Sequence, residues 1–207
     1  MTLIDHRQIQ RHFKKVDPTL AKIIQQVGPM TLKPQRDRFK MLVRSILSQQ
    51  VSTAAAASIR KKLEAKLGDA GVTAESVARL SIDELRAAGL SRQKASYLHD
   101  LAAKTQDGTV RLAKLGRMTD AEVIAELIQV KGIGVWSAQM FLIFALGRLD
   151  VFPIDDFGVR TAMHHLYAFE EPQKKAVLLK IGETWRPYAT IGSWYCWRFL
   201  ELHRQKK

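Results

Sequence analysis

Hydrophobic residues recur at the spacing of an α-helix along most of the chain, and no segment shows the strict alternation of a half-buried strand. One apolar stripe runs over residues 9–27, where Pro18 predicts a break, and another runs over residues 36–47. Further helices are expected over residues 53–67, 92–105, 135–146, 171–184 and 188–202. The pattern predicts an all-α protein of roughly ten short helices.

Capping residues and glycines mark several helix boundaries. Ser52 is expected to cap the helix that Gly68 ends, because a serine oxygen accepts hydrogen bonds from the free N–H groups of a first turn. The segments Ser81–Glu84 and Thr119–Glu122 both fit the capping box, so a helix is expected to begin at each. The basic tail from His203 to Lys207 is expected to fray.

Two glycines interrupt the helical pattern in the segment Leu127-Ile-Gln-Val-Lys-Gly-Ile-Gly-Val-Trp-Ser-Ala138. Gly132 and Gly134 can adopt positive φ, so one helix is expected to stop there and another to restart at once. The restart exposes backbone N–H groups at a helix N-terminus, where phosphate binds readily. A Gly-x-Gly between helices is more often a simple cap and turn, so this segment alone leaves both interpretations open.

Two adjacent carboxylates follow in the segment Pro153-Ile-Asp-Asp-Phe-Gly-Val-Arg160, at the expected start of the next helix. Neighbours on a helix point about 100° apart, so only one of Asp155 and Asp156 can face a given site. Aspartate is also favoured as a helix cap, which is the structural alternative for both residues. A phosphate-binding hairpin followed by a carboxylate suggests chemistry performed on a nucleic acid.

The charge balance supports such a polyanionic partner. The chain of 207 residues carries 33 Lys and Arg against 20 Asp and Glu, a formal net charge of +13, which speeds the encounter with polyanions. Basic proteins of membrane surfaces share this feature. However, no stretch approaches the roughly 20 apolar residues of a spanning helix, and no signal sequence is expected at Met1.

The cysteine and histidine content limits the possible cofactors. Cys196 is the single cysteine, which excludes an internal disulfide, a cysteine-only zinc site and an iron–sulfur cluster. The histidines complete no metal motif, so no zinc is expected. The lone cysteine also predicts a reducing, intracellular compartment, most simply the cytoplasm.

Several segments together resemble the helix-hairpin-helix DNA glycosylase superfamily, and within it the DNA-3-methyladenine glycosylase II branch of alkylation repair. The resemblance spans about residues 36–200 and rests on Gly132-Ile-Gly134 with Trp136-Ser-Ala138, on Asp150–Asp156, on residues 42–52 and on residues 186–198. Longer members carry a further N-terminal domain of mixed sheet and helix, for which this chain has no room. Ala189 stands where related sequences often have Arg.

The resemblance implies a single domain over residues 1–207, with two lobes and a cleft between them. It implies Asp156 as the catalytic residue, with Asp155 as a helix cap or as a partner of Asp156. An ionised carboxylate near the sugar would stabilise the oxocarbenium-like charge that develops as a glycosidic bond breaks, and would orient the attacking water. The base pocket is expected to contain Trp136, Trp197, Met140 and Tyr188, although Met140 could instead belong to the core. Trp185 and Trp194 are expected to serve packing.

Position 136 bears on the type of reaction. Superfamily members that also cleave the DNA strand carry a lysine there, whose amine forms a Schiff base with the sugar. Trp136 takes that place, and the nearest lysine is Lys131. The resemblance therefore implies an enzyme that releases the base and stops.

The resemblance also implies the DNA contacts. The N–H groups near Gly132 and Gly134 would hold phosphate, and a structural monovalent cation (Na⁺ or K⁺) would bind the backbone carbonyls of Ile128, Val130 and Ile133. Gln50 matches the position of a wedge that fills the space of a flipped base, although it could be an ordinary turn residue. The other residues expected to bind DNA are Gln49, Lys131 and Arg44, and for Arg44 the alternative is a solvated face.

The sequence thus predicts a monofunctional DNA glycosylase that removes 3-methyladenine and 7-methylguanine from double-stranded DNA. It is expected to be a monomer that needs no cofactor and does not associate with membranes. The expected location is the cytoplasm, in association with the nucleoid if the protein is bacterial, or the nucleus if it is eukaryotic. Two alternatives stay open. One is a glycosylase for a neutral lesion such as 8-oxoguanine or uracil, and the other is a non-catalytic DNA-binding module.

Overall fold

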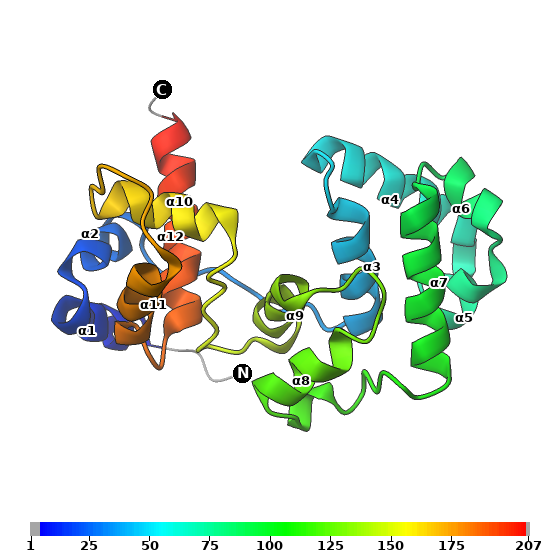
Figure 1. Cartoon of the computed structure of the whole chain (residues 1–207), viewed down its shortest axis with the longest axis horizontal. Helices are drawn as coiled ribbons and strands as arrows, with labels where there is room; N and C mark the ends of the chain where they lie inside the picture. The colour runs from blue at the N-terminus through cyan, green and yellow to red at the C-terminus, as the bar shows by residue number, and fades with distance from the viewer. Residues whose placement is uncertain (1–4, 206–207) are drawn as a thin grey trace. The chain divides into compact units, whose positions relative to one another are not determined.

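The computed structural model describes residues 5–205, which fold into twelve α-helices without a β-strand (Figure 1). This confirms the predicted all-α class, with twelve helices rather than roughly ten. The chain divides into two compact units. The terminal unit comprises Met1–Lys33 and Gly147–Lys207, and the central unit comprises Pro34–Leu146. The single domain expected over residues 1–207 therefore consists of two separately packed bodies.

Five helices build the terminal unit: α1 (His6–Val16), α2 (Pro18–Val27), α10 (Phe157–Leu166), α11 (Lys175–Thr184) and α12 (Ala189–Gln205). Asp17 explains the predicted break near Pro18, because its carboxylate accepts a hydrogen bond from the Leu20 N–H at 2.9 Å and caps α2. Pro18 lies in the first turn of α2. A backbone N–H at this position has no partner within the helix, so the N–H that proline lacks is not needed there.

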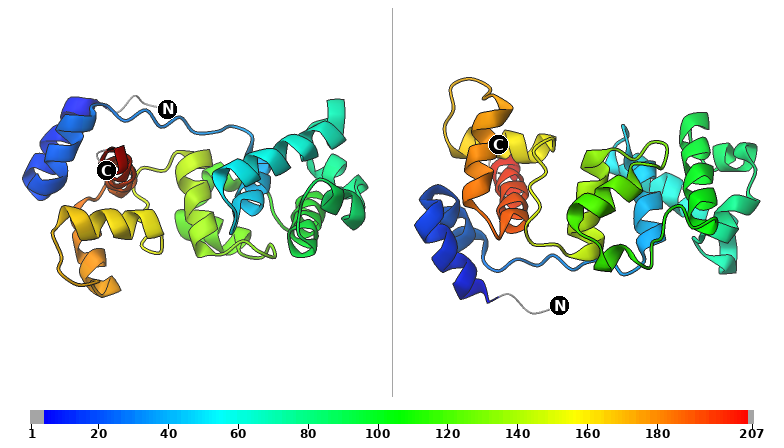
Figure 2. Two further views of the ribbon diagram at one scale, coloured as in Figure 1. Left: turned by 90° about the horizontal axis from the view of Figure 1, so that it is seen from above. Right: turned by 60° about the horizontal axis from the view of Figure 1, so that its bottom comes forward.

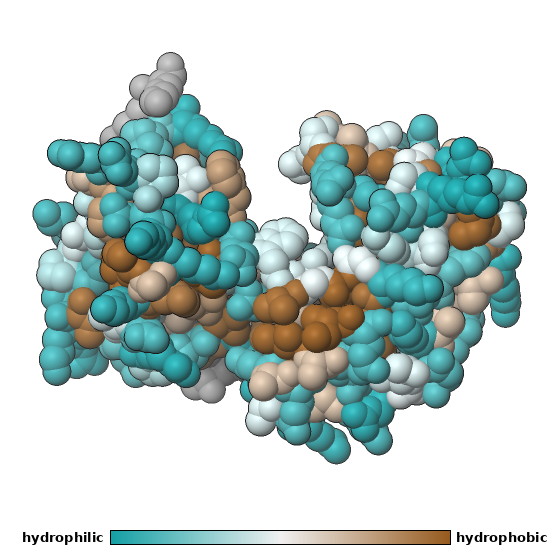
Figure 3. All heavy atoms as spheres, viewed as in Figure 1, coloured by the Kyte–Doolittle hydropathy of each residue, from teal (hydrophilic) through white to brown (hydrophobic). Residues whose placement is uncertain are grey.

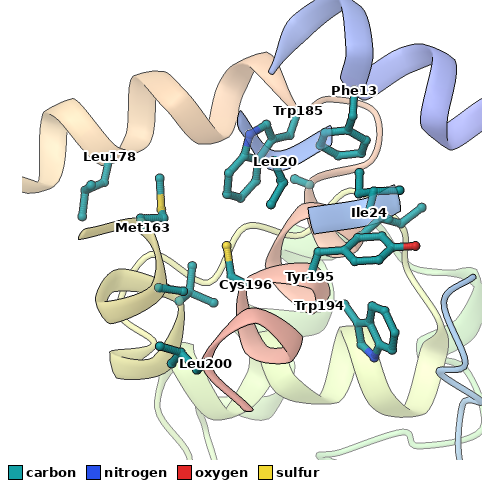
Figure 4. Packing of buried hydrophobic residues seen from close by; sticks show 14 of the residues in the cluster. Phe13, Leu20, Ile24, Met163, Leu178, Trp185, Trp194, Tyr195, Cys196 and Leu200 are labelled. Carbon is teal, nitrogen blue, oxygen red and sulfur yellow. The ribbon is translucent and has the colours of Figure 1, made fainter. Parts of the chain in front are cut away.

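Aliphatic and aromatic side chains together form the core of the terminal unit (Figure 4). Trp185 and Trp194 are buried, as predicted. The indole N–H of Trp185 donates to the buried carboxylate of Asp17 at 2.7 Å, and the Tyr167 hydroxyl donates to the same carboxylate, so this polar group is satisfied inside the core. α10 and α12 lie side by side (Figure 2). Residues packed in the same core include Phe13, Leu20, Ile24, Met163, Tyr195 and Leu200.

Seven helices build the central unit: α3 (Arg38–Ser48), α4 (Thr53–Leu67), α5 (Ala74–Arg79), α6 (Ile82–Ala87), α7 (Arg92–Gln106), α8 (Asp120–Leu127) and α9 (Val135–Phe141). A π-helical segment, η3 (Leu142–Leu146), continues α9, and short 3₁₀ turns lie at Gly68–Ala70 and Leu115–Arg117. α3 packs against α4, α7 and α9, and its inward residues Leu42 and Ile46 are fully buried. α3 is therefore the central helix of this unit.

The predicted caps are confirmed. Ser52 caps α4 and Gly68 follows its last residue, while Ser81 and Thr119 form capping boxes at α6 and α8. The sequence analysis missed α5, which is only 6 residues long and begins with a capping box in which Ser76 takes the place of the usual Glu or Gln. A helix this short has too few turns to show an apolar stripe.

Two predicted boundaries are wrong. α11 begins at Lys175 rather than at Glu171. α12 continues to Gln205, so His203 and Arg204 are helical instead of frayed; the remainder of the predicted fraying tail, Lys206 and Lys207, lies outside the described residues.

The visible surface is mainly hydrophilic, with an apolar area over α9 in the central unit (Figure 3). Val135 and Trp136, both at the start of α9, are 48% and 40% exposed. None of the helices that the structure describes combines the length and the apolar composition that crossing a membrane requires. Exposed apolar side chains are typical of binding surfaces, and Val135 and Trp136 directly follow the turn between α8 and α9.

Candidate functional site

The hairpin between α8 and α9 is a turn of residues 128–134 whose shape depends on Gly132. This residue has φ +82°, a left-handed conformation that other side chains rarely adopt. It also lies against the ring of Tyr97 on α7, so that a Cβ at this position would be 2.1 Å from the Tyr97 Cδ2 atom. Conformation and space therefore both require glycine. α8 ends at Leu127, earlier than predicted, because the turn takes up the residues before Gly132.

Gly134 behaves differently from Gly132, which corrects the prediction that both glycines have positive φ. It is the N-cap of α9 with φ −97° and ψ 179°, an extended conformation open to any residue. Within residues 5–205, no side chain caps this helix end, and a Cβ on Gly134 would meet no atom within 4 Å. The missing side chain leaves space for an anion beside the first amides of α9.

Two side chains of α7 anchor the hairpin. Asp100 accepts a hydrogen bond from the Lys131 backbone N–H at 2.8 Å and forms an ion pair with Lys104 at 2.8 Å, while Lys104 also donates to the Gln129 carbonyl. Burial raises the pKa of Asp100, but the hydrogen bonds from Lys104 and Lys131 outweigh it and hold this pKa below its ordinary value. The Lys131 side chain is 68% exposed, so its charge faces water.

The turn between α3 and α4 contacts the hairpin through Gln49. The Gln49 side-chain amide donates to the Gly132 carbonyl at 2.7 Å, so this residue, predicted to bind DNA, is engaged within the protein. Lys94 donates to the carbonyls of Leu47 and Gln49 at 2.8 and 2.6 Å and so satisfies the end of α3. Gln50 has φ +53° and an exposed side chain. Such a strained conformation in a non-glycine residue is typical of functional positions.

The three carbonyls predicted to bind a cation belong to the hairpin turn. The Val130 carbonyl accepts a hydrogen bond from the Ile133 N–H at 3.0 Å. A carbonyl has two lone pairs, so this bond does not exhaust its capacity. Backbone oxygens suit a hard cation such as Na⁺ or K⁺ better than a transition metal. The donor set of Ile128, Val130 and Ile133 is therefore chemically compatible with the predicted ion.

A cavity of about 500 Å³, the central cavity, lies between α3, α4 and α9. Trp136 and Met140 line it together, whereas Trp197 and Tyr188 are not among its lining residues. Arg44 and Arg60 line it as well, and the Arg44 Nη1 atom donates to Gln35 Oε1 at 2.8 Å. Arg44 was predicted as a DNA contact. The structure places it in the wall of this cavity, which is thus both aromatic and cationic.

The two adjacent carboxylates have different surroundings. Asp156 is the N-cap of α10 and is only 9% exposed, and its Oδ1 atom accepts hydrogen bonds from the Val159 N–H at 2.8 Å and from the Trp197 indole N–H at 2.9 Å. The Asp155 side chain is 50% exposed and forms an ion pair with Lys175 at 2.6 Å. The predicted alternative that Asp155 is the cap is therefore wrong. Of the two, Asp156 is the carboxylate with a fixed orientation.

Comparison with known proteins links the hairpin and this carboxylate. The model of the HhH-GPD superfamily, described as base excision DNA repair proteins, matches residues 43–187. The chain belongs to this superfamily. The matched segment contains the hairpin, most of the residues that line the central cavity, and both carboxylates.

Individual relatives extend the HhH-GPD match to nearly the whole chain. The alkylbase DNA glycosidase-like protein mag2 of Schizosaccharomyces pombe is 27% identical over 206 residues, which cover 97% of each chain. The structure of DNA-3-methyladenine glycosidase from Bacillus halodurans has a TM-score of 0.84 and 32% identity, over 94% of this chain and 89% of that one. The structure of Schizosaccharomyces pombe 3-methyladenine DNA glycosylase Mag1 in complex with abasic DNA has a TM-score of 0.82 and 29% identity, over 92% and 95% of the two chains.

Trp197 makes a hydrogen bond to Asp156 that was not predicted from the sequence. It was predicted to offer its face to a base, but its indole N–H is bound to Asp156 Oδ1. Gly158 adds to the same contact, because a Cβ there would lie 3.1 Å from both Asp156 Oδ1 and Trp197 Cδ1. The two partners of the bond are 41 positions apart, and the sequence holds no signal that pairs them.

Two further side chains of the terminal unit have structural surroundings. The Tyr188 hydroxyl accepts a hydrogen bond from Gln8 at 2.8 Å, and its ring packs edge-on against His12. These contacts are with α1, so we leave Tyr188 out of the candidate pocket. Cys196 is completely buried, and burial, with the charges of Asp17 and Asp156, raises the pKa of its thiol. The thiol is therefore kept neutral and is a poor nucleophile.

Proposed function

We propose that this protein is a DNA glycosylase that hydrolyses the N-glycosidic bond of alkylated purines, with 3-methyladenine and 7-methylguanine as its leading substrates. The observation that carries the proposal is Asp156, a nearly buried carboxylate whose Oδ1 atom is fixed by two hydrogen bonds. Asp17 is held in a similar way as the cap of α2, but only Asp156 lies in the segment that matches the base excision repair family. The relatives are named as glycosylases or glycosidases of alkylated bases, and one of them was solved in complex with abasic DNA, which supports the proposed substrate class.

The proposed chemistry uses Asp156 as an electrostatic group. As the bond between sugar and base breaks, positive charge develops on the sugar, and a carboxylate nearby stabilises it. Because Val159 and Trp197 fix the plane of this carboxylate, little reorganisation is needed when the charge appears. The same carboxylate would orient the water that attacks the sugar.

The proposed substrates follow from the leaving group. Alkylation at N3 or N7 of a purine places a positive charge on the ring, so the base departs without a general acid. The face of Trp136 would attract such a ring by ~0.5–2 kcal/mol, but Arg44 and Arg60 line the same cavity and repel a cation. We therefore expect selectivity to appear in the rate of bond cleavage more than in the affinity for the lesion.

We further propose that the enzyme is monofunctional. Trp136 occupies the position at which the related lyases carry their lysine, and an indole cannot form a Schiff base. The ammonium of Lys131 lies 4.0 Å from Asp100 in the anchor of the hairpin. Borohydride should therefore trap no covalent complex with DNA, and strands should break only after alkali or heat. A trapped adduct would show that the lyase reaction occurs.

The hairpin would supply DNA binding that does not depend on sequence. The amides near Gly134 and the exposed Lys131 would hold phosphate, with Gln50 as the wedge in the emptied stack. A Na⁺ or K⁺ ion on the carbonyls of Ile128, Val130 and Ile133 would add positive charge beside that phosphate. Log affinity should then fall linearly with log salt concentration, and an affinity that does not change with salt would contradict this role.

Chromatography of the bases released from methylated duplex DNA tests the proposal directly. We expect 3-methyladenine and 7-methylguanine to be released by the wild-type protein and not by Asp156→Asn. Single-lesion duplexes under single-turnover conditions give the comparison with neutral lesions. Faster release of uracil or 8-oxoguanine than of any cationic purine would transfer the assignment to a neutral lesion. Binding of DNA without release of any base would support the alternative of a non-catalytic DNA-binding module.

A further inference from the structure

The terminal unit contains a second cavity, of about 360 Å³, which we call the α10 cavity. It lies between α10, the loop that follows it and the start of α11. Its lining includes Phe157, Arg160, His164, Phe169, Lys175 and Leu178. Its volume falls within the usual range of small-molecule and nucleotide sites. None of the roles assigned above to the hairpin, the central cavity or Asp156 uses it.

The α10 cavity combines aromatic rings with positive charge. Phe157 is 73% exposed, an unusual state for a large apolar side chain, while Phe169 and His164 pack edge to face with ring centroids 6.4 Å apart. Leu178 is buried and provides an apolar surface. A flat aromatic ring would bury these surfaces, and base-to-aromatic stacking of this kind tolerates every base.

The charges around the α10 cavity favour an anion. Arg160 and Lys175 line it, and its lining contains no Asp or Glu. Within residues 5–205, Arg160 forms no ion pair, and Lys175 pairs with the half-exposed Asp155 at 2.6 Å. Asp155 offsets one of the two cations, so the cavity retains a net positive character. Stacking surfaces beside positive charge are the combination that recognises a nucleotide.

Phe157 follows Asp156 directly in the chain, at the start of α10. The α10 cavity therefore begins at the residue next to the carboxylate that we propose to act on the sugar. Resting on the proposed function, we propose that the α10 cavity binds the nucleotide next to the lesion, with its base against Phe157 and its phosphate on Arg160 and Lys175. This site is distinct from the pocket for the damaged base.

A binding experiment with a fluorescent base tests this site. The probe is a duplex with an abasic analogue at the target position and 2-aminopurine one nucleotide away, on either side in two separate duplexes. We expect one of them to change its fluorescence on binding to the wild-type protein and to lose most of this change with Phe157→Ala. Phe157→Ala should weaken binding about tenfold, the loss typical of a stacked base, and Arg160→Ala should weaken binding and make it less dependent on salt because a phosphate contact is lost.

Matched variants on the neighbouring helix control for general effects. Val177 and Lys180 on α11 do not line the cavity, so Val177→Ala and Lys180→Ala should bind the duplex like the wild-type protein. Equal losses in the control and cavity variants, or no loss in either, would overturn the proposal. Base release by the wild-type protein is measured separately. If no base is released but the cavity variants alone lose the fluorescence change, the glycosylase proposal fails and the nucleotide site stands.

Free ligands distinguish a DNA site from a mononucleotide site. Adenosine 5′-monophosphate, adenosine and ribose 5-phosphate are titrated against the ¹⁵N-labelled protein, and the amide shifts of α10 are followed. The proposal expects the shifts with the mononucleotide to exceed those with either fragment, and a short oligonucleotide to give the same shifts at lower concentration. Tighter binding of the free mononucleotide than of the oligonucleotide would overturn the assignment to DNA.

Discussion

Two helices of this protein begin in opposite ways. α9 begins after Gly134, and no side chain in the described part of the chain caps it, whereas α10 begins after Asp156, whose own carboxylate accepts the Val159 N–H. The free N–H groups at a helix start favour negative charge. α10 meets this preference with a side chain and thereby fixes that side chain, whereas α9 does not. Under the proposed function, the same helix property would suit phosphate binding in one unit and a fixed catalytic carboxylate in the other.

The two helix starts are also held by different means. The hairpin before α9 is anchored by the chain around it, through Asp100 on the Lys131 N–H and through Tyr97 against Gly132. The carboxylate before α10 is held by a side chain of α12, the indole of Trp197. Damage to the hairpin should therefore affect stability and binding, and damage to the carboxylate should affect the reaction.

Asp156→Asn gives the largest expected effect. Asparagine is as good an N-cap as aspartate, so the fold and DNA affinity should stay, while the loss of charge should slow base release by about a hundredfold to a thousandfold. Single-turnover release of 7-methylguanine measures the rate, and a gel-shift titration measures affinity. The matched variant Asp155→Asn, which breaks only the exposed pair with Lys175, should react like the wild-type protein. The reverse order of the two rates would transfer the catalytic role to Asp155.

The two glycines of the hairpin provide the second test. In Gly132→Ala the new methyl group collides with Tyr97 and occupies a left-handed conformation, so the free energy of unfolding should fall by about 1–3 kcal/mol and DNA affinity should fall with it. Gly134→Ala places its methyl group in open space with an extended backbone. Its free energy of unfolding should equal that of the wild-type protein. Its DNA affinity should nevertheless fall, because the methyl group occupies space beside the first amides of α9. Equal stability losses in both variants would contradict the difference between the glycines.

A smaller effect is expected at Trp197. Trp197→Phe removes the donor to Asp156 Oδ1 but keeps an aromatic ring. Loss of one hydrogen bond to a charged group should slow base release about tenfold, with unchanged DNA affinity because the hairpin is intact. Tyr188→Phe removes a hydroxyl that contacts Gln8 and should keep the full rate. If Trp197→Phe instead weakened the affinity for lesion DNA and spared the rate, Trp197 would act as a pocket wall.

The sequence predicted those parts of the fold that depend on neighbouring residues. Ser52, Ser81 and Thr119 were recognised as caps because a cap acts within a few positions. The hairpin was recognised for the same reason, although Gly132 and Gly134 could not be told apart. The ring that excludes a side chain at Gly132 belongs to Tyr97, which lies on another helix.

The parts that escaped prediction depend on packing between distant residues. The bond between Asp156 and Trp197 forms only once α10 and α12 meet. In the same way, the position of Arg44 in the central cavity depends on the packing of α3 against α9. Periodicity finds the apolar face of a helix but does not say which partner helix covers it.

The smallest effect concerns pH and the anchor of the hairpin. The pKa of Asp100 is held below its ordinary value, so its stabilising contribution is complete above the unfolded value of about 3.9 and is lost as the pH falls through the lower folded value. Asp100→Asn should therefore be less stable than the wild-type protein by about 1 kcal/mol at neutral pH, and this gap should shrink below pH ~4. Urea unfolding at several pH values measures it. Asp83→Asn, at a side chain that is 89% exposed beside Arg86 in the first turn of α6, should show a smaller gap of a few tenths of a kcal/mol. A gap that widens on acidification would mean that Asp100 is protonated more easily in the folded protein, and the carboxylate could then not be what anchors the hairpin beside α9.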